Sequence, residues 1–289
     1  MKLGEFLQNP EFKQKFILEK LIQEFCGLTR EEIRTNTDKE ITEEQKETLI
    51  NAYKSYLIDK KPLEYVVGHV DFFERSFFVD ENTLIPRPET EYMITAINEF
   101  MQEKKEKKSD FQLFDIGTWC GVLGISVLLE NPECFKNIIF CDISEGALKV
   151  AEKNYQNLVK TSYNHQFLKS DLADFIKDTE INDESIILVA NLPYIPDETF
   201  DHNALENVQK REPRIAFVGG DDGLNLYRRM FHQIEEQINA QKFQKHQITM
   251  FLEMMTRQTD LLRKEFQNMT FEEVKTFHFN IRIVKATRN

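Results

Sequence analysis

Five short apolar stretches that alternate with helical patterns constrain the fold of this chain more than any other feature. They span Gln112–Ile116, Asn137–Cys141, Gln166–Lys169, Ser185–Ala190 and Gln247–Glu253. Strands separated by helices form right-handed βαβ units, so the pattern predicts a mostly parallel sheet. The stretch Phe271–Ala286 then holds two β-rich segments with no helix between them, which is typical of an antiparallel pair at the end of a sheet. The sequence therefore predicts an α/β fold.

The beginning of the chain has a different pattern, which predicts a small helical domain. Apolar residues recur at helical spacing over Glu11–Phe25. Capping-box motifs begin at Thr29 and Thr42 and predict two further helices, the second reaching about Ile58. Since a single core stops growing near the 289 residues of this chain, two domains are expected.

A predicted β-hairpin separates the helical part from the mixed part. Two aromatic-rich runs within His69–Asp80 flank the polar pair Glu74–Arg75, which is the pattern of a short hairpin. The expected organisation is a helical domain over residues 1–62, a β-hairpin linker over 63–86 and the α/β domain over 87–289.

Composition narrows the class of partner and the compartment. The net charge of -12 works against sequence-blind binding of polynucleotides, so no direct nucleic-acid binding is expected. The cysteines have no CxxC spacing, so neither a metal site nor a disulfide framework is indicated. No segment has the apolar length of a signal peptide or a membrane span, and a cytoplasmic protein without membrane contact is expected.

Three predicted strands end in turns that suit a nucleoside ligand. The first is followed by a glycine turn and a helix over Leu113–Leu129, where glycines let the backbone approach a ligand at a helix N-terminus. Asp142 ends the second strand, where doubly wound folds place an acid for ribose hydroxyls. Asp171 and Leu172 follow the third strand. Each turn alone is equally compatible with an ordinary loop, but together they surround one pocket, as S-adenosylmethionine is surrounded in Rossmann-like methyltransferases.

The fourth strand ends abruptly in Asn191-Leu192-Pro193-Tyr194, which would lie beside the methyl group of such a ligand. An amide or aromatic-amine nitrogen is a poor nucleophile and must be held by acceptors. The Asn191 side-chain carbonyl and the Leu192 main-chain carbonyl can accept its two N–H groups. Pro193 biases Leu192 toward extended backbone, and Tyr194 offers a flat face to a planar group.

The segment Pro62–Glu91, which contains "IPRPETE", resembles the HemK/PrmC family of protein-(glutamine-N5) methyltransferases. "FDIGTWCG", "CDIS", "KSDL", "NLPYI" and "REPRIAFVGGDDGLNLYRRM" follow in family order. The resemblance implies a class I (Rossmann-like) methyltransferase domain joined through a β-hairpin to an N-terminal helical substrate-recognition domain. It further implies methyl transfer from S-adenosylmethionine to the glutamine of the Gly-Gly-Gln motif in peptide chain release factors. A monomer without a metal site is expected.

The resemblance also implies roles for individual residues. Gly117, Thr118 and Gly121 would line the methionine end of the cofactor, Asp142 would hold its ribose, and Leu172 would border its adenine. The full predicted cofactor set is Asp115, Gly117, Thr118, Trp119, Cys120, Gly121, Asp142, Asp171, Leu172 and Asn191. The predicted substrate set is Asn191, Leu192, Pro193, Tyr194, Arg87 and Glu89, and Asn191, Pro193 and Tyr194 are the predicted catalytic residues. The favoured interpretation of "IPRPETE" is a domain-coupling role at the active-site entrance, and a structural linker is the alternative.

Two departures from the family pattern bear on activity. The family's Asn-Pro-Pro-Tyr is here Asn-Leu-Pro-Tyr, which loosens the backbone that directs the acceptor carbonyl. Trp119 and Cys120 replace the Gly-Ser/Thr pair in the middle of the turn, and a Trp would be strained at a position that needs a positive φ.

Two other functions remain open on the sequence alone. Asn-Leu-Pro-Tyr is also the spelling of rRNA adenine dimethyltransferases, so an adenine-N6 RNA methyltransferase is one alternative. Trp119 motivates the other, a catalytically weak relative that acts as a binding protein.

Overall fold

The computed structural model describes residues 1–104, 111–181, 185–203, 212, 214–240, 246–274 and 281–288. Its residues divide into two compact units, Met1–His69 and Val70–Asn289. No helix in the described residues is long and apolar enough to cross a membrane.

The first unit is helical. Its helices are α1 (Leu3–Gln8), α2 (Lys15–Cys26), α3 (Arg30–Thr35), α4 (Glu43–Leu57) and α5 (Leu63–Val67). The capping boxes are confirmed, because the Thr29 and Thr42 hydroxyls accept from main-chain N–H groups three residues later. The first predicted helix begins four residues later than expected, at Lys15, because the Asn9 side chain accepts from the N–H of Glu11 and turns the chain.

The hairpin consists of β1 (His69–Phe72) and β2 (Arg75–Phe78) and is confirmed, but its turn lies one residue earlier than predicted. Phe73 and Glu74 form the turn with φ of 47° and 61°. Both values are left-handed, as the common two-residue hairpin turn requires. Phe73 N–H donates to Glu91 Oε1 at 2.9 Å, which holds this conformation, and Arg75 belongs to the second strand.

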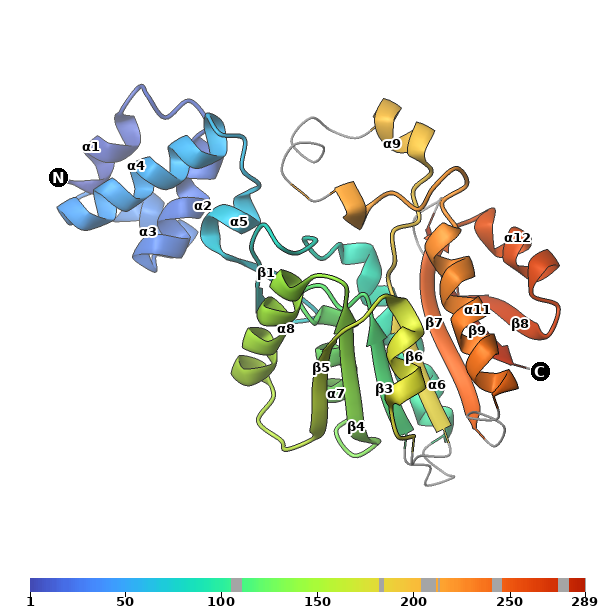
Figure 1. The fold of residues 1–289 in the computed structure, drawn as a ribbon. Coiled ribbons are helices and arrows are strands. Elements are labelled where there is room, and N and C mark those ends of the chain that lie inside the picture. The colour runs from blue at the N-terminus through green and yellow to red at the C-terminus, as the bar shows by residue number, and fades with distance from the viewer. Residues whose placement is uncertain are drawn as a thin grey trace. The chain divides into compact units, whose positions relative to one another are not determined.

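The second unit is built on a seven-stranded sheet of order β5-β4-β3-β6-β7-β9-β8 (Figure 1). The strands are β3 (Phe111–Ile116), β4 (Phe135–Asp142), β5 (Asn164–Lys169), β6 (Ser185–Ala190), β7 (Gln247–Met255), β8 (Met269–Val274) and β9 (Ile281–Arg288). β3 to β7 are parallel, whereas β9 runs antiparallel to both β7 and β8. The predicted strands and the α/β fold with an antiparallel end are confirmed.

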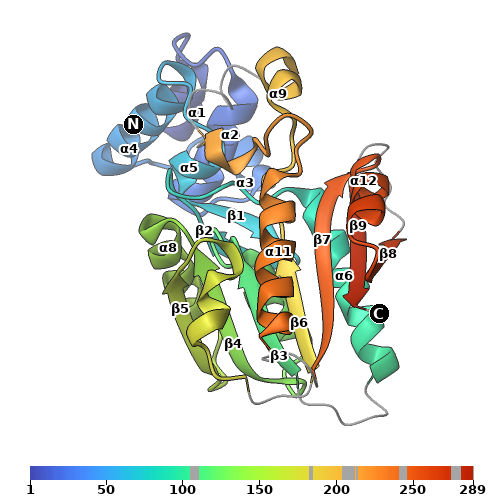
Figure 2. The same ribbon diagram turned by 45° about the vertical axis from the view of Figure 1, so that its right-hand side comes forward.

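Helices cover both faces of the sheet. The elements are η1 (Pro88–Thr90), α6 (Glu91–Lys104), α7 (Val122–Glu130), α8 (Glu145–Leu158), η3 (Leu172–Asp178), α9 (Asp197–Asn203), η4 (Arg214–Ala216), α11 (Asn225–Asn239) and α12 (Gln258–Glu265). α6, α7 and α8 pack on one face, and η3, α11 and α12 pack on the other; Figure 2 shows α11 in front of the sheet and α6 behind it.

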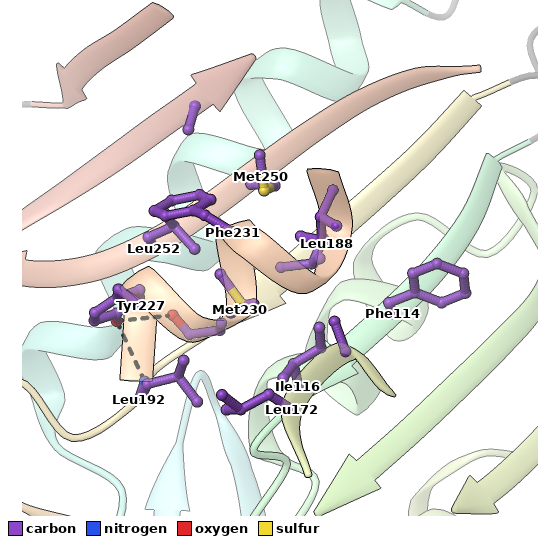
Figure 3. Packing of buried hydrophobic residues seen from close by; sticks show 14 of the residues in the cluster. Phe114, Ile116, Leu172, Leu188, Leu192, Tyr227, Met230, Phe231, Met250 and Leu252 are labelled. Carbon is purple, nitrogen blue, oxygen red and sulfur yellow. Dashed lines mark hydrogen bonds between the residues drawn. The ribbon is translucent and has the colours of Figure 1, made fainter. Parts of the chain in front are cut away.

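The strand order reverses between β3 and β6, and this reversal positions the site. From β3 the chain moves outward to β4 and β5, then returns to β6 on the other side of β3. Open α/β sheets bind ligands outside the carboxyl ends of the strands at such a switch point. Figure 3 shows the core that supports it, with Tyr227, Met230 and Phe231 of α11 packed over Leu188 and Met250 of the sheet.

Candidate active site

A cavity of about 410 Å³ lies at the carboxyl ends of the parallel strands. Its lining consists of Asn82, Gly117, Trp119, Asp142, Ile143, Ser144, Ser170, Asp171, Leu172, Leu192, Pro193, Ile215, Leu226 and Arg229. The structure thus brings together residues from all four predicted turns. The volume lies in the range of about 300–1,000 Å³ that is usual for small-molecule sites.

The glycine turn after β3 approaches the cavity closely. Gly117 has φ of 69°, and a Cβ on it would lie 2.9 Å from Leu192 Cδ2, so a larger residue here would be strained and would displace the Leu192 side chain. Trp119 adopts a φ of 52°, a left-handed conformation that costs a side-chain-bearing residue about 1–3 kcal/mol. Its main-chain N–H donates to Asp142 Oδ2 at 3.0 Å, which ties the turn to the next strand.

Asp142 is buried at the end of β4, with a relative exposure of 4%. Its Oδ1 accepts from Ser144 N–H at 2.9 Å. Burial raises the pKa of Asp142, and main-chain hydrogen bonds from Ser144 and Trp119 oppose that shift. A carboxylate has about four acceptor positions, so Asp142 can still accept from ligand hydroxyls.

The third turn forms an apolar wall. Leu172 has φ of 55° and is a second left-handed residue on the cavity lining. The Asp171 carboxylate is paired with Arg229 of α11. Ile143 and Ile215 line the cavity although their exposures are 53% and 60%, so they offer apolar surface to a ligand. Sequence analysis missed both, although the position of Ile143 directly after Asp142 is a usable signal.

Four predicted cofactor residues support the turn. Asp115 is fully buried; its Oδ2 accepts from Thr118 Oγ1 at 2.6 Å and from Gly124 N–H at 3.0 Å. Burial raises the pKa of Asp115 to about 7. Gly121, with φ of 81°, precedes α7. Burial raises the pKa of the Cys120 thiol to about 12, which makes this thiol unreactive.

A second, smaller cavity of about 20 Å³ connects these residues with Asn191. Its lining consists of Leu84, Pro86, Arg87, Thr90, Gly117, Thr118, Trp119, Cys120, Val122, Leu123 and Asn191. Gly117 and Trp119 line both cavities. Asn191 therefore lies across the glycine turn from the larger cavity.

Buried polar groups surround Asn191. Its Nδ2 donates to Thr90 Oγ1 at 3.2 Å, and Thr90 Oγ1 donates to Glu253 Oε2 at 2.8 Å. The Tyr194 hydroxyl donates to Glu253 Oε1 at 2.8 Å. Burial raises the pKa of Glu253, whereas the hydrogen bonds from Thr90, Tyr194 and Asn191 favour its ionised form. Thr90 and Glu253 were not among the site residues predicted from the sequence.

Other contacts fix the main chain of the Asn-Leu-Pro-Tyr turn. Leu192 N–H donates to the Tyr227 hydroxyl at 3.3 Å, as Figure 3 shows, and this hydroxyl lies 2.5 Å from the Glu253 carbonyl oxygen. A proline at position 192 would lack that N–H, so Leu192 replaces ring rigidity with a hydrogen bond. Gln258 Nε2 donates to the Tyr194 carbonyl at 2.7 Å.

The other two predicted substrate residues lie in "IPRPETE". Arg87 pairs with Glu212 Oε1 at 2.8 Å, and the Glu212 side chain is 2% exposed. Burial is the main cause of the raised pKa of Glu253 and of Tyr194, and the charge of Glu89 adds to both shifts. Arg87 therefore connects "IPRPETE" to the "REPRIAF" segment, and Glu89 lies within electrostatic reach of the Asn191 surroundings.

A doubly wound sheet with this glycine turn, a buried acid at the end of β4 and an Asn-Leu-Pro-Tyr turn defines a Rossmann-like methyltransferase, and residues 96–249 match the family model described as "Methyltransferase small domain". A release factor glutamine methyltransferase from Bacillus anthracis is 36% identical over 69% of this chain and 67% of the relative. Another from Caulobacter vibrioides is 32% identical over 79% and 73%. The chain belongs to the release factor glutamine methyltransferase family. The predicted family, enzyme class and S-adenosylmethionine cofactor are thereby confirmed.

Solved structures show the same fold. The human METTL16 catalytic domain in complex with the MAT2A 3′UTR hairpin 6 has a TM-score of 0.53 and 11% identity, over 97% of this chain and 93% of that chain. The human METTL16 N-terminal domain in complex with SAH has a TM-score of 0.51 and 13% identity, over 97% of each chain. At these identities the similarity concerns the fold alone.

Proposed function

We propose that this protein transfers a methyl group from S-adenosylmethionine to the side-chain amide nitrogen of the glutamine in the Gly-Gly-Gln motif of peptide chain release factors. The position of Asn191 carries the proposal, because Asn191 lines a small cavity that shares Gly117 and Trp119 with a cavity of cofactor size. The family of the relatives supports the same substrate. In this proposal the N-terminal helices recognise the release factor.

The lining of the larger cavity fits S-adenosylmethionine. Asp142 can accept from ribose hydroxyls, and Ile143 and Leu172 offer apolar surface to adenine. Trp119 lines both cavities, and its Nε1 is buried without a hydrogen-bond partner in the described structure, so this donor can still bind the amino-acid end or an intervening water. When bound, the cofactor supplies an electrophilic methyl group.

The Asn-Leu-Pro-Tyr turn would then prepare the nitrogen. The Asn191 side-chain carbonyl and the Leu192 main-chain carbonyl accept its two N–H groups, which directs the nitrogen toward the methyl group. As the new bond forms, positive charge develops on nitrogen, and the two carbonyl dipoles stabilise it. The nitrogen finally loses one proton to solvent, so this scheme needs no strong base. Tyr194 packs its ring against the planar amide.

Peptide mass spectrometry tests the proposal. A cognate release factor is incubated with S-adenosylmethionine and either this protein or its Asn191→Ala variant, then digested with trypsin. We expect one added methyl on the Gly-Gly-Gln glutamine with the unchanged protein. The variant should fold and bind the cofactor, while transfer falls by about 10²–10³-fold. If the folded, cofactor-bound protein leaves that glutamine unmodified but methylates adenine in rRNA, the substrate assignment is wrong.

A further inference from the structure

A buried chain of hydrogen bonds runs from Asn191 through Thr90 to Glu253. The two distances are 3.2 Å and 2.8 Å, and Thr90 and Glu253 are 2% and 1% exposed. The three hydrogen-bonded residues come from three separate segments: η1, β7 and the turn after β6. Ala190 of β6 pairs with Leu252 of β7. The residues that follow these two, Asn191 and Glu253, therefore lie side by side.

The chain of hydrogen bonds has only one direction when Glu253 is ionised. A carboxylate accepts and does not donate, and a hydroxyl has a single proton. Because Thr90 gives its proton to Glu253, its oxygen can only accept from Asn191. Asn191 must then present its NH₂ group to Thr90. Tyr194 donates to the other Glu253 oxygen, so both oxygens receive a proton from a hydroxyl.

The direction of these hydrogen bonds determines which group of the Asn191 amide faces away from Thr90. The amide has nearly the same shape in two orientations that exchange its oxygen and nitrogen. With the nitrogen toward Thr90, the carbonyl oxygen points away from Thr90 and can accept a proton. In the flipped orientation an NH₂ group would face the N–H of the substrate amide, and two donors cannot form a hydrogen bond.

We propose that Thr90 and Glu253 are positioning residues that fix the amide orientation of Asn191, so that its carbonyl oxygen faces the nitrogen to be methylated. The proposal rests on the proposed function for its catalytic consequence, but the orientation itself is a property of the protein alone. It also gives "IPRPETE" a specific role, because Thr90 is the threonine of that segment.

The first measurement needs no substrate. The protein is labelled with ¹⁵N-asparagine, and the side-chain NH₂ signal of Asn191 is assigned as the one lost in Asn191→Ala. We expect Thr90→Val to speed solvent exchange of this NH₂ group, because the Thr90 acceptor is gone and only the hydrogen bond to Glu253 remains. Thr90→Ser keeps the acceptor and should retain slow exchange. Thr249→Val is the matched control, since Thr249 of β7 is equally buried at 2% exposure and should leave Asn191 unchanged.

The second measurement is methyl transfer to the release factor by the same variants. Thr90→Val should lower kcat by about 10²-fold, the usual effect of losing one oriented group in the transition state. Thr90→Ser should restore kcat to within a few fold, and cofactor Kd should stay within twofold throughout. Glu253→Gln keeps the shape of the side chain, but its amide can donate to Thr90. This would reverse the direction of the hydrogen bonds, so the variant should lower kcat as Thr90→Val does.

The two measurements separate this inference from the proposed function. Unchanged exchange of the Asn191 NH₂ group in Thr90→Val, or equal losses of kcat in Thr90→Ser and Thr90→Val, overturns the positioning role of Thr90. Should Thr90→Val fail to fold, Glu253→Gln is tested by the same exchange measurement. Unchanged exchange of the Asn191 NH₂ group in that variant overturns the positioning role. If the unchanged protein methylates no release factor, the exchange pattern still establishes or rejects the orientation, and the substrate assignment alone is wrong.

Discussion

Two side-chain-bearing residues at the cavity have left-handed backbone. Trp119 and Leu172 have φ of 52° and 55°, and each such residue costs about 1–3 kcal/mol. The sequence identified Trp119 as a residue that would be strained if its position required a positive φ, and the structure meets that condition. Strain of this kind persists where surrounding contacts fix it; here the N–H of Trp119 is held by Asp142.

Substitution of Trp119 separates backbone strain from side-chain contacts. Trp119→Gly and Trp119→Ala both remove the indole, but only glycine adopts a positive φ without a steric cost. We therefore expect the glycine variant to exceed the alanine variant in free energy of unfolding by about 1 kcal/mol, measured by urea denaturation. The pair Leu172→Gly and Leu172→Ala should show the same order. Equal stability within a pair would mean that the turn relaxes away from the left-handed region in the alanine variant.

At the scale of elements, parallel strands explain why so much of the site could be predicted. Carboxyl ends of parallel strands meet at one edge, so the turns after β3, β4, β5 and β6 had to converge once the strands were identified. Thr90 and Glu253 were missed because their partnership depends on tertiary register. A signal did exist for Glu253: it is a lone acid within an apolar strand, and a buried acid requires partners.

The hydrogen bond between Tyr227 and Leu192 predicts a coupling between α11 and the turn after β6. Tyr227→Phe would leave the buried N–H of Leu192 without its acceptor, which should cost about 1–3 kcal/mol in unfolding free energy. In a Leu192→Pro background there is no N–H that could lose its acceptor. Tyr227→Phe should then lower the unfolding free energy by at least 0.5 kcal/mol less, which is roughly the smallest coupling expected of contacting residues. A double-mutant cycle by urea denaturation measures this difference. Additive costs would show that the hydroxyl stabilises the fold through the Ala190 and Glu253 carbonyls and not through Leu192.

At the scale of the whole molecule, all residues that line both cavities belong to one unit. They run from Asn82 to Arg229, within Val70–Asn289, whereas residues 1–69 have a separate core. Sequence analysis placed the end of the helical domain at residue 62, before the hairpin. The structural division falls at His69, because α5 packs on α4 and Leu63, Val66 and Val67 join the core of the first unit. Sequence periodicity alone could not assign a five-residue helix to either side.

This division predicts that cofactor binding stabilises the two units unequally. A ligand stabilises the region that unfolds together with its site, by about 2.7 kcal/mol at a free concentration of 100 times Kd. Amide exchange of core residues such as Leu188 and Met250 should therefore slow by about a hundredfold when S-adenosylmethionine is added at that concentration, because their exchange requires opening of the second unit. Amides of Leu21 and Leu49, in the first core, should change by less than twofold. Hydrogen–deuterium exchange read by mass spectrometry measures both sets in one experiment, with the Asp142→Ala variant as a control of weakened binding. Equal slowing in both cores would show that the two units unfold as one, in which case binding at the strand ends would also stabilise the helices proposed to recognise the release factor.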